Sequence, residues 1–240
     1  MGKTGSMRNT QQRGIAIGPI LAVVAILAVL ASAIAAGSGA FNGDTSAVKA
    51  KAQATAILEY AEEVKFAVDR VLGKGCTDTE ISFENPIVSG YTNPNSPSDK
   101  SCHVFDVNGG GIVWKNPPDN ISEYGEYFYS GAHGFVGTSS PVGGPNPTQE
   151  LALLLPDIPR NICEEINKLL SDGTSIINIG NVFGFVEQSK FNGTYRYGYT
   201  ILNNLPFSIC LKTNLTHYDP VANPRVETGE YHFYKVLIAH

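Results

Sequence analysis

The sequence predicts an α+β fold, in which a long N-terminal helix packs on a β-rich domain. Three observations support this prediction. An uncharged apolar run occupies residues 15–36, an amphipathic helical pattern follows over residues 45–72, and short apolar runs separated by turn residues begin at Cys76. Apolar residues that recur every three or four positions indicate a helix, whereas strands are short and bounded by turns. We therefore expect a basic leader (residues 1–14), an apolar helix (15–36), a hinge with an amphipathic helix (37–75) and a β-rich domain (76–240).

The apolar run is long enough to cross a lipid bilayer. As an α-helix it would extend roughly 33 Å, which matches the hydrocarbon core of a membrane. Lys3, Arg8 and Arg13 precede the run, and no comparable basic group follows it closely. The positive-inside rule then places the N-terminus in the cytoplasm and the residues after the run across the membrane.

Residues 37–44 contain three glycines, and a hinge is expected there because each glycine weakens a helix by roughly 1 kcal/mol. Asp44 can cap the next helix, since its carboxylate accepts backbone N–H bonds and favours the positive helix end. That helix is expected from Thr45 to about Leu72, with Gly73 and Gly75 ending it. Its predicted apolar face consists of Val48, Ile57, Tyr60, Ala61, Val64, Val68, Val71 and Leu72.

The chain beyond Cys76 reads as loops, strands and one further helix. Residues 102–107 and 112–115 are expected to form a hairpin around residues 108–111, Asn-Gly-Gly-Gly. Pro- and Gly-rich residues 90–101 and 131–147 are expected to be surface loops. A short helix is expected up to Leu170, with Asn161 as its cap. Later strands are expected near residues 176–179, 182–186, 195–201, 208–212 and 231–239.

Four aromatic residues gather within the Pro-, Gly-, Ser- and Tyr-rich residues 116–146. They are Tyr124, Tyr127, Phe128 and Tyr129. Such a cluster can be an interaction patch for a partner subunit or a sugar, or it can pack a loop onto the sheet. Packing is the favoured interpretation.

All four cysteines lie beyond the apolar run, in the compartment where disulfides persist. Three pairings are open. We favour Cys76 with Cys102 and Cys163 with Cys210, because each pair joins a helix end or face to a nearby later segment. A zinc site is not expected, since the chain has no Cys-x-x-Cys pair.

Neither catalysis nor nucleic-acid binding is expected. The five histidines lack metal-ligand spacing, no Gly-x-Ser-x-Gly motif occurs, and no carboxylates stand out as a pair. His232 and His240 alternate on the last predicted strand and are expected to face solvent. A net charge of −5 without a basic cluster outside the leader argues against a nucleic-acid partner. We therefore expect no enzyme, no cofactor and no metal.

The N-terminus admits three interpretations. It can be a secretory signal peptide cut near residues 33–35, where small residues alternate, although its apolar run exceeds the usual signal core. It can be a plain single-span anchor. The third interpretation starts from Arg13-Gly14, which ends a short basic leader just before the apolar run. This arrangement resembles the class III leader of type IV pilins and type II secretion pseudopilins, in which a prepilin peptidase cleaves after glycine, here between Gly14 and Ile15.

The resemblance implies a pilin-like fold, with the membrane helix continuing into an amphipathic half that packs on an antiparallel sheet. It implies other pilin-like subunits as partners through the N-terminal helix, together with the prepilin peptidase and the bacterial inner membrane. The domain would be periplasmic before assembly and extracellular in the filament. Pro19 stands where the family usually has Glu, which favours a minor subunit. A Cys163–Cys210 pair would resemble the C-terminal disulfide region of type IV pilins.

The function expected from these features is structural: a minor subunit of a type IV pilus-like or type II secretion pseudopilus filament. The alternative is a secreted or membrane-tethered periplasmic binding or adhesion domain that uses residues 116–146.

Overall fold

The structure is a computed structural model that describes residues 45–134, 150–170, 175–179, 190–195, 200–201, 206–213, 216–217, 225–226 and 230–239. The leader, the cleavage site, the apolar run and the glycine-rich hinge lie outside the described residues. So do the strand expected at residues 182–186 and most of the loop expected at 131–147. The chain divides into two compact units, Met1–Ser46 and Ala47–His240, and nearly all described residues belong to the second.

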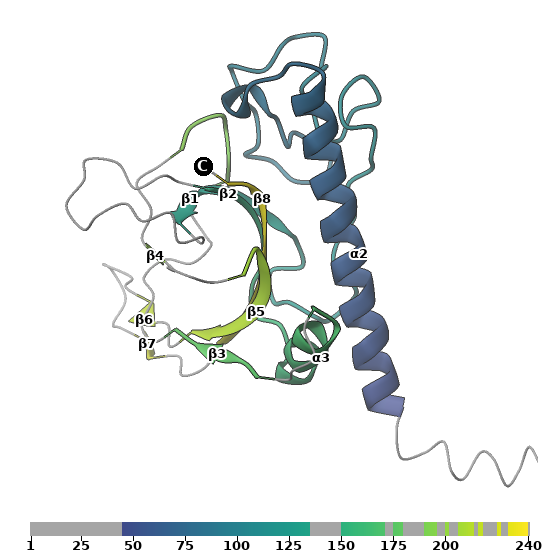
Figure 1. Cartoon of the computed structure of the whole chain (residues 1–240), viewed down its shortest axis with the longest axis vertical. Helices are drawn as coiled ribbons and strands as arrows, with labels where there is room; N and C mark the ends of the chain where they lie inside the picture. Colours follow the sequence, from purple (N-terminus) through teal and green to yellow (C-terminus); the bar gives the residue numbers. More distant parts are fainter. Residues whose placement is uncertain are drawn as a thin grey trace, which may run out of the picture. The chain divides into compact units, whose positions relative to one another are not determined.

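The predicted amphipathic helix is present as α2 (Thr45–Gly73) (Figure 1). Its buried face is Ala50, Ala54, Ile57, Tyr60, Ala61, Val64, Ala67, Val68 and Val71. The helix ends at the predicted glycines, since Gly75 adopts a φ of +99° that other residues avoid. Val48 was expected on the apolar face but is 64% exposed. The packing surface of α2 begins only at Ala50, which is its first buried residue.

A six-stranded sheet in the order β3-β5-β8-β2-β1-β4 forms the body of the domain. Its strands are β1 (Phe128–Gly134), β2 (Glu150–Leu155), β3 (Ile177–Asn178), β4 (Thr200–Ile201), β5 (Ser208–Thr213) and β8 (Glu230–Ile238). A separate pair consists of β6 (Thr216–His217) and β7 (Arg225–Val226).

The sheet is mixed, which corrects the expectation of an antiparallel sheet. The four inner strands pair antiparallel, but the two-residue outer strands β3 and β4 run parallel to β5 and β1. These outer neighbours are far apart in the chain, and a long connection can bring a strand back in the parallel direction. Because β1 covers residues 128–134, the start of the loop predicted at residue 131 is strand instead.

Side chains alternate between the two faces of the sheet. Along β2, Leu151, Leu153 and Leu155 join the core shared with α2, whereas Ala152 and Leu154 join a smaller core on the opposite face. All six residues of β2 are buried. This strand was not predicted, because a strand buried on both faces is a continuous apolar run without alternation.

The second helix, α3 (Arg160–Leu170), packs on the same core as α2 through Ile162 and Ile166 (Figure 1). Asn161 lies inside its first turn and therefore cannot be the cap that the sequence suggested. The helix instead follows Pro159, whose carbonyl accepts the N–H of Ile162. A fixed φ suits proline at a helix start.

Two interactions attach α3 to β5. One is the predicted disulfide Cys163–Cys210. In the other, the Asn167 amide donates to the carbonyl of Cys210 at 2.7 Å and accepts the N–H of the same residue at 2.8 Å. Asn167 thus makes the backbone hydrogen bonds that a neighbouring strand would make to Cys210, because β3 pairs only with Leu211 and Lys212 of β5.

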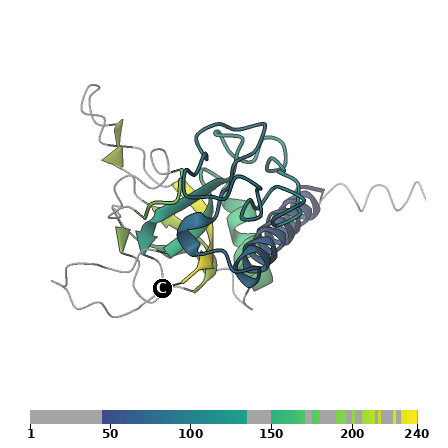
Figure 2. The same ribbon diagram turned by 90° about the horizontal axis from the view of Figure 1, so that it is seen from above.

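Residues 74–127 form a lobe with little regular structure, whose one short helix is η1 (Asp78–Glu80). Figure 2 shows its loops gathered at one end of the helix–sheet core. The hairpin predicted for residues 102–115 is wrong, because residues 102–110 form mainly turns and residues 111–115 have no regular structure. A Cβ at Gly109 or Gly110 would lie 2.0 or 2.3 Å from the carbonyl oxygens of His103 and Val104. The glycines therefore serve close backbone packing within the lobe.

An aromatic core joins the lobe to the sheet and to α2. Tyr129 of β1 is fully buried, and its ring stacks on Phe83 of the lobe with 4.2 Å between centroids. Its hydroxyl lies 3.3 Å from that of Tyr60 in α2, and its N–H donates to the hydroxyl of Tyr91 at 3.2 Å. Tyr91 lies in the segment 90–101 that was expected to be an exposed loop, so that expectation fails at this residue.

Replacing Tyr129 separates ring packing from hydrogen bonding. We expect Tyr129→Ala to cost about 3–5 kcal/mol of unfolding free energy, because it leaves a cavity among aromatic rings. Tyr129→Phe removes only the hydroxyl and should cost about 1 kcal/mol. Chemical denaturation followed by fluorescence of Trp114, the single tryptophan, measures both. Equal losses in the two variants would contradict the central role of the ring.

Candidate functional site

The charged residues in the C-terminal half of α2 are held by the rest of the domain. Glu62 pairs with Lys235 of β8, and Glu63 pairs with Lys115 of the lobe. Arg70 donates to the carbonyl of Gly110 at 2.6 Å. Cations at a helix C-terminus also interact favourably with the helix dipole. This half of α2 is therefore fixed to both the sheet and the lobe.

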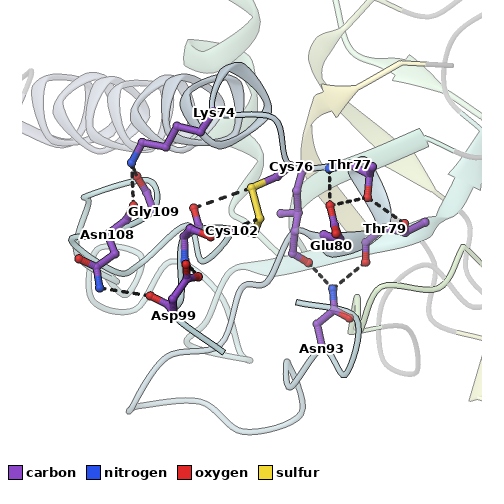
Figure 3. The surroundings of a disulfide bond; sticks show 12 residues. Lys74, Cys76, Thr77, Thr79, Glu80, Asn93, Asp99, Cys102, Asn108 and Gly109 are labelled. Atoms are coloured by element: carbon purple, nitrogen blue, oxygen red, sulfur yellow. Dashed lines mark hydrogen bonds between the residues drawn. A yellow bond between two sulfur atoms is a disulfide. The ribbon is translucent and has the colours of Figure 1, made fainter. Parts of the chain in front are cut away.

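The lobe is attached to the end of α2 by a second set of bonds (Figure 3). The predicted disulfide Cys76–Cys102 is present, and Lys74 donates to the backbone carbonyls of Asn108 and Gly109 at 2.7 Å each. By the chain-entropy estimate, a disulfide closing a loop of this size stabilises by roughly 3.5 kcal/mol. Residues 102–109 are thus attached at both ends to the C-terminal end of α2.

The N-terminal half of α2 has a different surface. Val48, Ala52 and Ala56 lie on successive turns of the face directed away from the sheet, and all three are exposed. Lys49, Lys51 and Glu59 are also exposed, and within the described residues their side chains form no ion pair or hydrogen bond. We call the first set, together with these charged residues, the outer face of α2.

This outer face was not singled out from the sequence. A helical wheel places Val48, Ala52, Ala56 and Glu59 away from the buried face, whereas Lys49 and Lys51 lie on its two opposite flanks. Only the contacts of the folded domain distinguish Lys49, Lys51 and Glu59 from Glu62, Glu63 and Arg70, which are charged as well but have partners within the domain.

A shallow apolar groove of about 310 Å³ lies beside α2. It is lined by Lys65, Asp69, Leu72, Phe207, Val236, Leu237, Ile238 and Ala239. Phe207 is 55% exposed, and its carbonyl accepts the N–H of Val236 at 2.7 Å. None of the residues predicted from sequence as functional lies in this groove.

The predicted aromatic patch is largely internal. Tyr127 and Tyr129 are buried in the core beneath α2, and Phe128 is buried on the opposite face of the sheet. Tyr124 is 38% exposed and meets Phe128 edge to face at 5.6 Å. Three of the four residues therefore pack inside the domain and do not form an exposed interaction surface. Consecutive residues of a strand point to opposite faces of the sheet, and here both faces are covered.

His232 is the centre of a buried polar cluster, which corrects the expectation that it faces solvent. It is 1% exposed because β8 lies between β5 and β2 with both faces covered. The backbone N–H of Asp157 donates to Nδ1 at 3.4 Å, so the proton is assigned to Nε2, which lies 2.8 Å from Oγ1 of Thr213. Oε2 of Glu230 lies 3.7 Å from the same Nε2.

This cluster contains the groups that a metal ion would need. Ligand atoms of Asp157, Glu230 and His232 all lie within 4.8 Å of one another. Both ring nitrogens of His232 already have hydrogen-bond partners, however, so coordination would require the loss of one of these bonds. The arrangement as it stands links the β2–α3 turn to β5 and β8, which is a structural role.

Comparison of the chain with protein-family models, with curated proteins and with solved structures finds no match. None of the described helices is both long enough and apolar enough to cross a membrane. The predicted processing residues Gly14 and Ile15 lie outside the described residues. The functional proposal therefore rests on the residues of this chain.

Burial lowers the pKa of His232 to about 3, against an ordinary value of 6.5. Below pH 6.5 the unfolded imidazole takes up a proton and the folded one does not, so stability should fall as the pH falls from 6.5 towards 3. At pH 5 the loss from this residue should be roughly 2 kcal/mol. In His232→Gln the unfolding free energy should vary less between pH 7 and pH 5. Identical slopes for both proteins would contradict this assignment.

Proposed function

We propose that this chain is a minor structural subunit of a type IV pilus-like or type II secretion pseudopilus filament, held in the inner membrane before assembly. The observation that carries the proposal is α2. This 29-residue amphipathic helix begins at Thr45, so only eight residues separate it from the apolar run at residues 15–36. An apolar helix leading into an amphipathic helix that packs on a sheet is the arrangement that the resemblance to pilins implies.

The way α2 is held supports an assembly role. Its first five residues, 45–49, are all exposed, so the helix starts before its packing surface on the domain begins. Its C-terminal half is fixed by ion pairs to Lys235 and Lys115 and by the bonds of Arg70. Among the described residues the N-terminal half of α2 thus has the more exposed surface, and in the sequence it is the half nearer to the apolar run.

The two disulfides support an extracytoplasmic location for the domain. Cys76–Cys102 and Cys163–Cys210 account for every cysteine in the chain. Such bonds persist in oxidising compartments and are rare in the cytoplasm. In the proposed topology the leader, residues 1–14, stays cytoplasmic, and the prepilin peptidase cuts between Gly14 and Ile15.

A binding domain that uses residues 116–146 is the alternative function. Three of the four residues of the aromatic patch are buried and cannot contact a ligand at the surface. Tyr127, Phe128 and Tyr129 are each at most 4% exposed. No observation on the described residues favours this alternative over a subunit role.

Intact-mass and N-terminal analysis of the protein from its host's membrane fraction tests the processing step. We expect a mature chain that starts at Ile15, because Arg13-Gly14 ends the leader. A start near Ile34 or Ala36 would indicate a released secretory protein. An uncut chain would indicate a plain membrane anchor, and either result would contradict the proposal.

A charge in the apolar run should block assembly. We expect Val24→Asp or Ala28→Asp to abolish incorporation into the filament, because a carboxylate at the centre of an apolar helix costs several kcal/mol. The near-isosteric Ala28→Ser serves as the control and should still be incorporated. Both disulfides should form in all variants, which shows that the domain folds. Normal incorporation of the Asp variants would contradict a packing role for residues 15–36.

A further inference from the structure

The two disulfides differ in how far they lie from solvent. Cys163 and Cys210 are both 0% exposed and join α3 to β5 inside the main hydrophobic core. Cys76 is only half-buried, and the residues directly before and after it are exposed. Its partner Cys102 is 2% exposed. The Cys76 end of one disulfide therefore lies at the surface of the domain, whereas both ends of the other lie in the core.

The lobe has attachments that do not depend on its disulfide. The N–H of Ser82 donates to the carbonyl of Cys102 at 3.0 Å, and the N–H of Val104 donates to the carbonyl of Ser82 at 2.9 Å. These bonds keep Cys102 beside the segment that carries Phe83, whose ring stacks on Tyr129. The aromatic core can therefore stay in place when the disulfide of the lobe opens.

The core disulfide Cys163–Cys210 has the opposite setting. Asn167 lies one turn after Cys163 in α3, and its amide bonds both the N–H and the carbonyl of Cys210. A thiol reaches this disulfide only when α3 separates from β5. Such an opening is a sub-global unfolding event, which is rare in a native protein.

We propose that Cys76–Cys102 is a redox-sensitive latch on the lobe. A dithiol, such as the Cys-x-x-Cys pair of a thiol–disulfide oxidoreductase, opens it while Cys163–Cys210 stays closed and the domain stays folded. Exposed disulfides are the labile and regulatory ones, whereas buried ones resist reduction. The inference does not depend on the filament role, because it uses only contacts within the domain.

The opening step is a thiol–disulfide exchange. A thiolate of the dithiol attacks Sγ of Cys76, the bond between the two native sulfur atoms breaks, and Cys102 leaves as a thiolate that takes a proton from water. The second thiol of the reductant then attacks the mixed disulfide and releases Cys76. Two electrons pass in total, so the dithiol becomes a disulfide and both cysteines of the latch are reduced.

The latch controls the part of the lobe inside the loop that it closes. It joins residues 26 apart in the sequence, so it limits the conformations that the segment between them can adopt when it loosens locally. Tyr91 and Asn93 hold the middle of this segment by burial, but residues 98–100 are all exposed. Opening should therefore loosen the chain around Lys100 first.

Timed reduction of the full-length chain, purified in detergent from its host's membranes, tests the selectivity. Dithiothreitol is the probe, and N-ethylmaleimide labels the released thiols for mass spectrometry. We expect Cys76 and Cys102 to be labelled at least about tenfold faster than Cys163 and Cys210, because the second pair waits for sub-global opening. In guanidinium chloride both pairs should react at similar rates, which controls for intrinsic reactivity. Equal rates in the native protein, or faster labelling of the core pair, would overturn the latch.

Limited trypsin digestion tests what the latch controls. Lys100 and Lys168 of α3 are matched sites, since their side chains are 52% and 57% exposed. Opening should raise cleavage after Lys100 several-fold and leave cleavage after Lys168 unchanged. The fluorescence of buried Trp114 should also stay the same, because the aromatic core keeps its contacts. Selective reduction without faster cleavage at Lys100, or with a changed Trp114 spectrum, contradicts a local latch.

The double variant Cys76→Ser, Cys102→Ser gives the open state without a reductant. Its cleavage after Lys100 should equal that of the reduced wild-type chain, and Cys163–Cys210 should still form. If this variant does not fold, the timed reduction decides alone, since it needs no substitution. Selective reduction in a chain that is not cut after Gly14 would support the latch and contradict the subunit role, so the two proposals fail separately.

Discussion

The packing around Tyr129 is the constraint on which the rest of the domain depends. Its ring stacks on Phe83, and it exchanges hydrogen bonds with Tyr60 and Tyr91, so one residue of β1 contacts both α2 and the lobe. Burial raises the pKa of the Tyr129 hydroxyl well above its usual value, which keeps it neutral. The irregular lobe therefore packs on the domain without a sheet of its own, because a few aromatic rings bury a large apolar area.

The domain holds α2 at its C-terminal end and leaves the first residues of the helix exposed. Bonds from Arg70 and Lys74 and the disulfide Cys76–Cys102 attach the lobe to the end of the helix. At the other end, the first buried residue of α2 is Ala50. The first residues of α2 are therefore the part of the helix that the described domain leaves exposed.

The features missed at the sequence level share a physical origin in non-local contacts. β2 lacks alternation because both of its faces are covered, and the glycines at 109 and 110 serve close backbone contacts with His103 and Val104 and not a hairpin. His232 was expected to face solvent because its strand is the last in the chain. The strand is central in the sheet, however, since β5 and β2 pair on either side of it.

The sequence alone determined the two helices, because helical periodicity is a local signal. It left three cysteine pairings open and favoured the one that the structure contains. It also supplied the apolar run and the Gly14 leader on which the pilus proposal depends. Only the tertiary structure decided which charges of α2 are used inside the subunit. Glu62 and Glu59 look alike in the sequence, yet Glu62 pairs with Lys235 of β8, whereas Glu59 has no ion-pair partner among the described residues.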